Sequence, residues 1–125
     1  MIIIKNTCEL NENELIACNE LIKQNFTSSR INTYEKTILY YSDSIIVGFL
    51  GISHDNYLNQ LCVDTNHREK GYATKLLNKA FDILNGNIYL FVDKNKSNTY
   101  FLTSFYKKHG FIIEYQNKEE IKMYK

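Results

Sequence analysis

Residues 57–84 constrain the fold of this chain more than any other stretch. Tyr57–Val63 is rich in β-prone residues, and a short polar turn containing Gly71 follows it. A strand that leads through such a turn into a helix creates an anion site, because the first N–H groups of the helix have no internal partner and the helix dipole is positive there. The helix is indicated by apolar residues at i, i+3, i+4, i+7, i+8 and i+11: Ala73, Leu76, Leu77, Ala80, Phe81 and Leu84.

The length and composition fit one compact domain, residues 1–125, with no room for two independent cores. Hydrophobic residues make up 44% of the chain, and the net charge of +1 comes from well-mixed charges of both signs. That balance argues against a nucleic-acid binder or an anionic membrane surface. No targeting segment is evident, and Cys8, Cys18 and Cys62 show no CxxC spacing. We therefore expect a cytoplasmic protein without a metal site.

The first third of the chain predicts a strand, a helix and a hairpin. Residues 2–5 are expected to form the strand, and Asn11-x-x-Glu14 resembles a capping box that opens the helix. Residues 27–36 predict a loop or a short second helix, and residues 37–42 with Ile45–Ser53 predict an antiparallel hairpin. The inward face of the helix is expected to carry four residues: Leu15, Cys18, Ile22 and Phe26.

The last third predicts a strand, a helix and two further strands. Residues 88–92 form an unbroken apolar run, typical of a strand covered on both faces. Residues 99–109 predict a helix, and residues 111–115 and 121–124 predict the final strands. One side of that helix is expected to carry Phe101, Leu102, Phe105 and Tyr106. Together these elements predict an α/β (α+β) fold, a mixed and mostly antiparallel sheet of about six to seven strands flanked by three to four helices.

Two motifs in this order point to a family. Arg68-x-x-Gly71-x-Ala73 says little alone, but here it lies between a strand and a strongly periodic helix, the context that binding a phosphate requires. Phe105-Tyr106-x-x-x-Gly110-Phe111 follows one strand later, at the end of a helix. Together they resemble the GNAT superfamily of acetyl-CoA-dependent N-acetyltransferases. The motifs cover roughly a third of the chain, and the order of elements extends the resemblance to nearly all of it.

The resemblance implies a binding site for acetyl-CoA. The backbone of the fourth strand at Leu61, Cys62 and Val63 would pair with the pantetheine arm, and the N–H near Leu61 would polarise the thioester carbonyl. Backbone N–H groups of the turn would hold the pyrophosphate, with positive charge from Arg68 and Lys70. The turn comprises Glu69, Lys70, Gly71, Tyr72, Ala73 and Thr74. Ala73 stands where a second glycine is commoner in the family.

The resemblance also implies a catalytic acid. Tyr106 matches the tyrosine that donates a proton or a hydrogen bond to the departing thiolate. Asn98 is a candidate contact to the cofactor or a helix cap, with Asn95 as a second choice, although the family's usual asparagine position is occupied by Thr99. A tyrosine taken alone would more often be a core aromatic residue, but the position of Tyr106 before the x-x-x-Gly110-Phe111 signature favours the functional role. Because transfer in the family is direct, Cys62 is interpreted as a small strand residue rather than a nucleophile.

The base is not identified by the motifs. Asn59 and Gln60 stand on the fourth strand where family members often carry a carboxylate, and neither accepts a proton usefully. Asp55 and His54, in the turn before this strand, are the nearest titratable residues, although both can be simple turn residues. A chain of water molecules is the other option.

The sequence thus predicts direct acetyl transfer from acetyl-CoA to a primary amine of a small molecule or a peptide, by a monomer or homodimer. The alternatives are a non-catalytic acyl-CoA-binding module on the same fold and an unrelated nucleic-acid binder. The acceptor is not identified.

Overall fold

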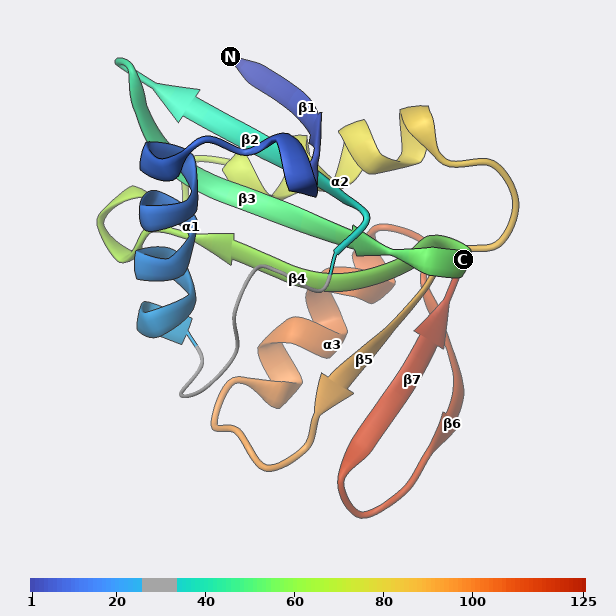
Figure 1. Ribbon diagram of the computed structural model, residues 1–125. Coiled ribbons are helices and arrows are strands. Elements are labelled where there is room, and N and C mark those ends of the chain that lie inside the picture. The colour runs from blue at the N-terminus through green and yellow to red at the C-terminus, as the bar shows by residue number, and fades with distance from the viewer. Residues whose placement is uncertain (26–33) are drawn as a thin grey trace.

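The computed structural model describes residues 1–25 and 34–125 (Figure 1). The predicted loop or helix at residues 27–36 and the inward position of Phe26 lie largely outside the described residues. The strands are β1 (Ile2–Asn6), β2 (Lys36–Ser42), β3 (Ile45–Ser53), β4 (Tyr57–Val63), β5 (Tyr89–Asp93), β6 (Ile112–Gln116) and β7 (Glu120–Tyr124). The helices are α1 (Glu12–Asn25), α2 (Tyr72–Ile83) and α3 (Thr99–Lys108), with short 3-10 turns between some elements.

The strands form one sheet in the order β1-β2-β3-β4-β5-β7-β6. Neighbouring strands are antiparallel except β4 and β5, which are parallel because α2 carries the chain back between them. The predicted mixed, mostly antiparallel sheet with flanking helices is therefore confirmed. None of the helices in the described ranges is long and apolar enough to cross a membrane.

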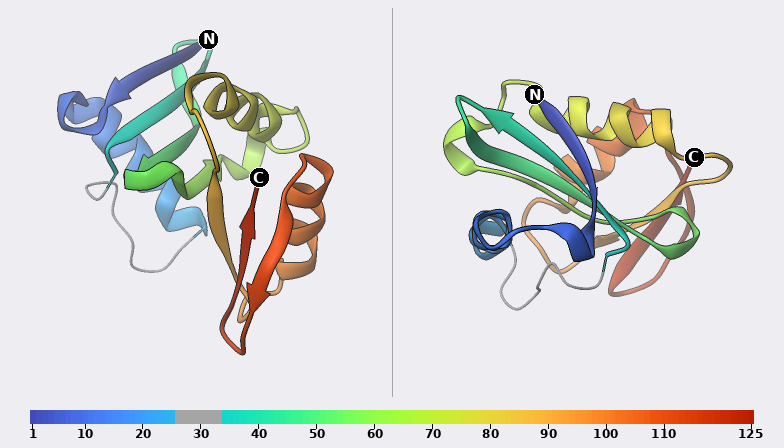
Figure 2. Two further views of the ribbon diagram at one scale, coloured as in Figure 1. Left: turned by 90° about the vertical axis from the view of Figure 1, so that its right-hand side faces the viewer. Right: turned by 45° about the horizontal axis from the view of Figure 1, so that its top comes forward.

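The sheet has helices on both faces (Figure 2). α2 and α3 cover one face, where Leu76, Leu77 and Ala80 of α2 are buried in the larger core. α1 covers the other face, where Cys18 and Ile22 contribute to a smaller core beneath β2, β3 and β4. The sheet is thus covered by a helix on both faces only in its first half.

Two predictions about burial are wrong, the first of them because of this uneven cover. The run at residues 88–92 is not buried on both faces: Leu90 and Val92 are buried, whereas Tyr89 and Phe91 are half-buried because α1 does not extend over β5. Phe101 was expected on one side of α3 with Leu102, Phe105 and Tyr106, but these three pack against the core whereas 68% of the surface of Phe101 is exposed. It lies in the first turn of α3, where the apolar spacing of the helix continues beyond the edge of the hydrophobic core.

The predicted capping box of α1 is confirmed. The backbone N–H of Glu14 donates to Asn11 Oδ1 at 2.8 Å, and the backbone N–H of Asn11 donates to Glu14 Oε1 at 2.9 Å. The carboxylate of Glu14 is buried and also accepts hydrogen bonds from Lys5 Nζ at 2.8 Å and Tyr41 Oη at 3.0 Å. It therefore joins the start of α1 to β1 and β2. Burial alone would raise the pKa of Glu14, but the hydrogen bonds from Lys5, Asn11 and Tyr41 outweigh it and the pKa is lowered.

We expect Glu14→Gln to lower the free energy of unfolding by about 1–3 kcal/mol near neutral pH, because it removes a buried charge-assisted hydrogen bond. Since the folded pKa lies below the unfolded one, this stabilisation is complete above the unfolded pKa and is lost as the pH falls through the folded pKa. Urea denaturation of both proteins over an acid titration measures the difference. Glu12→Gln, on the exposed side of the same helix turn, is the control. If the difference in free energy of unfolding between wild type and Glu14→Gln persists unchanged in acid, the charge of Glu14 is not its source.

Candidate active site

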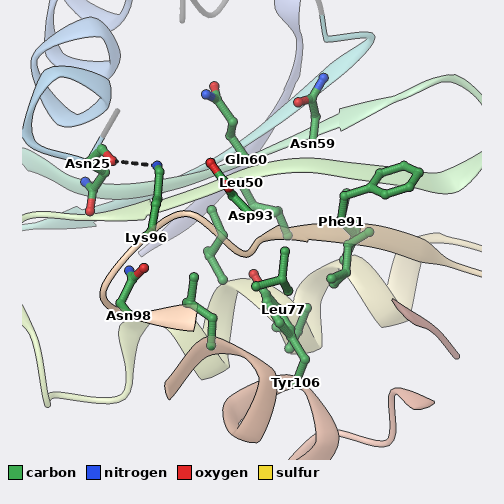
Figure 3. Close-up of a pocket in the computed structure, with 15 residues that line it drawn as sticks. Asn25, Leu50, Asn59, Gln60, Leu77, Phe91, Asp93, Lys96, Asn98 and Tyr106 are labelled. Atoms are coloured by element: carbon green, nitrogen blue, oxygen red, sulfur yellow. Dashed lines mark hydrogen bonds between the residues drawn. The ribbon is translucent and has the colours of Figure 1, made fainter. Parts of the chain in front are cut away.

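β4 and β5 are paired at a single position. Tyr57 at the start of β4 is opposite Tyr89 at the start of β5, and no further pair joins the two strands in the described residues. Beyond this pair the strands diverge (Figure 1). A cavity of about 150 Å³ opens there, with β4, β5 and α3 around it (Figure 3). Its lining consists of Asn25, Leu50, Leu58, Asn59, Gln60, Leu61, Leu77, Leu90, Phe91, Val92, Asp93, Lys96, Asn98, Leu102 and Tyr106.

β4 has a β-bulge at Asn59, beside this cavity. β3 pairs with β4 on both sides of Asn59 but not at Asn59 itself. The extra residue breaks the strict alternation of faces. Leu58 and Leu61 both contribute to the core beneath α2, whereas Cys62 belongs to the core beneath α1 and Gln60 shares its face. Because β5 has diverged, the β4 edge along the cavity offers backbone N–H and C=O groups to an extended amide ligand.

The turn before α2 has a backbone conformation that favours glycine. Gly71, the N-cap residue, has φ +79°, and a Cβ atom at this position would meet no atom within 4 Å. The first helical hydrogen bond runs from Lys75 N to Gly71 O at 3.0 Å, so the N–H groups of Tyr72, Ala73 and Thr74 have no acceptor within the helix. An open turn with free N–H groups at a helix start fits a phosphate group.

The connection from β4 to this turn is attached to the C-terminal turn of α1. Gln24 Nε2 donates to Asp64 Oδ1 at 2.8 Å, and His67 Nδ1 lies 2.7 Å from Asp64 Oδ2. The hydrogen bonds from Gln24 and His67 hold the pKa of Asp64 below its ordinary value. Arg68 Nη2 donates to Asn25 Oδ1 at 2.5 Å, so the predicted phosphate-binding arginine also fixes the position of the connection.

Tyr106 extends from α3 into the cavity, opposite Asn59 and Gln60 of β4 (Figure 3). Its hydroxyl group makes no hydrogen bond within the described part of the chain and is available to a ligand. Burial raises the pKa of Tyr106, with a smaller contribution from Cys62. The phenol therefore stays protonated at neutral pH and can donate.

Thr74 joins the start of α2 to the end of α3. Its hydroxyl group lies 3.3 Å from His109 Nε2. Burial, followed by the neighbouring charges of Lys108 and Lys125, lowers the pKa of His109, which favours the neutral imidazole. This contact places the predicted phosphate turn next to the helix that carries Tyr106.

The other predicted cofactor residues divide into two groups. Leu61 and Asn98 line the cavity, and Asn98 stands at the start of α3 without capping it through its side chain. Cys62 is buried on the opposite face, where burial raises the pKa of its thiol to about 12. Val63 lies at the end of β4, and the turn residues from Arg68 to Thr74 follow it outside the cavity. Asn95 does not line the cavity.

The structure does not bring the two predicted base residues to the cavity. His54 and Asp55 lie in the 3-10 turn His54–Asn56, before the position where β4 and β5 are still paired. His54 Nδ1 is 2.9 Å from Glu35 Oε2, and its side chain is 86% exposed. Both residues are therefore at the closed end of the split, whereas the cavity opens farther along β4.

Asp93 is a cavity residue that the sequence interpretation missed. It ends β5 and is the one carboxylate among the lining residues that the structure describes. Its Oδ1 accepts a hydrogen bond from the backbone N–H of Asn95 at 2.8 Å. A carboxylate directly after an apolar strand was visible in the sequence, but its position facing β4 depends on the order of strands in the sheet. No cluster of three or more metal-ligating side chains occurs among the described residues.

Comparisons with known proteins agree with this geometry. The family model for the acetyltransferase (GNAT) domain matches residues 7–122. Similar solved structures include *Arabidopsis thaliana* Naa50 in complex with the bisubstrate analogue CoA-Ac-MVNAL, with TM-score 0.77, 22% identity, and 99% of this chain and 97% of that chain covered. *Escherichia coli* ElaA has TM-score 0.77 and 18% identity, with 100% and 99% covered.

A third similar structure is the PaiA N-acetyltransferase from *Thermoplasma acidophilum* in complex with coenzyme A, with TM-score 0.72, 18% identity, and 100% and 98% covered. A search of curated protein sequences found no significant match. At these identities the structural likenesses show the fold, while the family model extends over nearly the whole chain. The chain therefore belongs to the acetyltransferase (GNAT) domain family.

Proposed function

We propose that this protein transfers an acetyl group from acetyl-CoA directly to a primary amine of a small molecule or a peptide. The observation that carries the proposal is the cavity at the β4–β5 split. On one side lies the Tyr106 hydroxyl group, which has no partner among residues 1–25 and 34–125, and on the other lies the backbone edge of β4 that β5 leaves open. An N-acetyltransferase needs this combination, because the acetyl donor must be aligned and a proton donor must lie next to its leaving group.

The residues around the split fit acetyl-CoA. The edge of β4 near Leu61 offers hydrogen bonds to the amide arm, and the turn at Gly71 offers free N–H groups to the pyrophosphate. When bound, acetyl-CoA supplies the acetyl group as a thioester. Tyr106 would donate its proton to the sulfur that leaves. The raised pKa of Cys62 and its position on the other face support direct transfer without a thiol intermediate.

Asp93 is our candidate for the proton acceptor. A primary amine with a pKa near 10.4 is only about one part in 10³ neutral near pH 7, which costs on the order of 4 kcal/mol unless a group removes the proton. Asp93 lines the cavity, whereas His54 and Asp55 do not. Its carboxylate can attract the ammonium group and accept its proton, directly or through water. A carboxylate in the cavity supports an enzyme over a non-catalytic acyl-CoA-binding module.

We expect acetyl-CoA to raise the Tm of the protein, since a ligand at a hundred times its Kd stabilises by about 2.7 kcal/mol. Gly71→Ala should weaken acetyl-CoA binding at least tenfold, because a Cβ atom would enter the open phosphate turn and the helix start would be strained. Gly86→Ala is a matched control, since Gly86 has φ +85° with no neighbour near its Cβ position, and it lies beyond the other end of α2. Differential scanning fluorimetry over a series of acetyl-CoA concentrations measures the Tm shift of the wild type and of both variants. No shift with millimolar acetyl-CoA would overturn the donor assignment.

Tyr106→Phe should lower kcat by about 10²-fold, because it removes the proton donor. Acetyl-CoA affinity and the free energy of unfolding should change little, since the hydroxyl group has no partner among the described residues. Release of free CoA thiol in the presence of a panel of amines measures the rate. Tyr115→Phe, on β6 outside the cavity, is the control. Equal loss of rate in both variants would exclude a specific role for Tyr106.

Asp93→Asn should lower kcat/KM for alkylamines at least tenfold near neutral pH, and the loss should shrink as the pH rises toward the pKa of the amine. Asparagine can still accept the hydrogen bond from Asn95, so the loop geometry is preserved. Asp55→Asn and His54→Gln test the two residues that the sequence pointed to, and we expect both to stay near the wild-type rate. The assignment fails if either of these lowers the rate more than Asp93→Asn does.

A further inference from the structure

Gln60 has an amide group with no hydrogen-bond partner in the described part of the chain. Only 8% of the residue is exposed, its Oε1 atom is buried, and its side chain makes no hydrogen bond with any described residue. The side chain lines the cavity at the split (Figure 3). A buried amide without partners destabilises a folded protein, so an unsatisfied amide that faces a cavity indicates that a ligand completes its hydrogen bonds.

None of the neighbouring residues that the structure describes forms a hydrogen bond with the Gln60 amide. On β3 it is opposite Gly51, and a Cβ atom at Gly51 would lie 2.4 Å from the ring of Tyr34. Tyr34 therefore packs on the same face of the sheet, next to Gln60. Its own hydroxyl group is also buried and without a partner in the described ranges, so the two polar groups do not satisfy each other. Tyr34 does not line the cavity, whereas Gln60 does.

The position of Gln60 indicates the side of the cavity from which an acceptor would approach. The bulge at Asn59 turns Gln60 away from the α2 side, toward the face that α1 covers, while Tyr106 enters from α3 on the opposite side (Figure 3). A donor bound between the β4 edge and Tyr106 would thus leave Gln60 facing the molecule that approaches from the other face. Asp93 lines the same cavity and carries the charge that attracts an ammonium group.

We propose that Gln60 recognises an acceptor whose amine has an amide group two or three bonds away, as in an α-amino amide or the first residue of a peptide. This inference rests on the proposed function and names the acceptor class. A primary amide side chain offers one acceptor oxygen and two N–H donors, and the amide of such a substrate offers the complementary pair. A simple alkylamine would reach Asp93 but would leave Gln60 unsatisfied, which a site built for hydrogen bonding disfavours.

The test compares alaninamide with 2-aminobutane, which has a similar shape but no amide. Gln60→Met should lower kcat/KM for alaninamide about tenfold and change that for 2-aminobutane less than twofold. Comparing each amine with itself in the two proteins removes the difference in amine pKa. Binding of both amines to the CoA-bound protein, measured by saturation-transfer NMR, gives the same comparison without turnover.

Tyr34→Phe is the matched control, because it also removes a buried polar group without a partner but outside the cavity lining. Both variants should raise the Tm by about 2–4 °C, since each replaces an unsatisfied polar group by an apolar one. Only Gln60→Met should affect alaninamide, and Gln60→Leu provides a second apolar variant.

The outcomes separate this inference from the proposed function. Binding of alaninamide that depends on Gln60, without acetylation of either amine, would refute the proposed function and leave the recognition site in place. Equal binding of alaninamide to wild type and Gln60→Met, or no binding to wild type, would overturn the inference even if alkylamines are acetylated. A lower Tm for Gln60→Met, with unchanged kinetics, would show a purely structural glutamine.

Discussion

The single pairing of Tyr57 with Tyr89 is the constraint on which the rest of this structure depends. Neighbouring parallel strands ordinarily share a ladder of hydrogen bonds, but β4 and β5 are in register at one position only. Aromatic packing supports this point: the rings of Tyr57 and Tyr89 stack at 5.1 Å with 7° between their planes, and Phe91 meets Tyr57 edge-on at 5.6 Å. The two halves of the sheet are further joined by the core beneath α2, which includes residues of β4, β5 and β7. Side-chain packing thus takes over the role of the missing backbone bonds, and the strands can separate without dividing the molecule.

The separation and the bulge at Asn59 together give the site two sides. If β4 alternated strictly, Leu58 and Gln60 would share one face and Asn59 and Leu61 the other, so each face would mix apolar and polar side chains. The extra residue instead places Leu58 and Leu61 toward α2, where an acyl thioester needs an apolar wall, and turns Gln60 to the other face. In the proposed mechanism, donor and acceptor approach a common point from opposite faces of the sheet. This arrangement avoids competition between the two ligands for the same wall.

Local features of this structure could be predicted from the sequence, and long-range ones could not. The apolar spacing from Ala73 to Leu84, the glycine at the start of α2 and the Asn11–Glu14 cap are each decided within a few residues, and the structure has them where the pattern indicated. The bulge at Asn59 leaves no trace in the composition of β4, because a shift of faces depends on which residues β3 offers as partners. Asp93 was missed for the same reason: its distance along the chain from β4 is large, and only the strand order brings it to the cavity. His54 and Asp55 were close to β4 in sequence but lie at the end where the split is closed.

The end of α1 connects both sides of the site, and this affects how Arg68 should be understood. Asn25 accepts a hydrogen bond from Arg68 through its side chain and one from Lys96 through its backbone oxygen at 3.2 Å, so one residue holds the connection before α2 and the loop after β5. Gln24 adds two bonds to the same connection, through Asp64 and the backbone N–H of Thr65 at 3.0 Å. In the proposed complex, Arg68 would therefore reach the pyrophosphate only with the N–H groups that Asn25 leaves free, and the backbone N–H groups of α2 would supply the main attraction. In this structure the motif arginine is first a positioning residue for the turn, and in the proposed complex its charge would add to the attraction of the helix start.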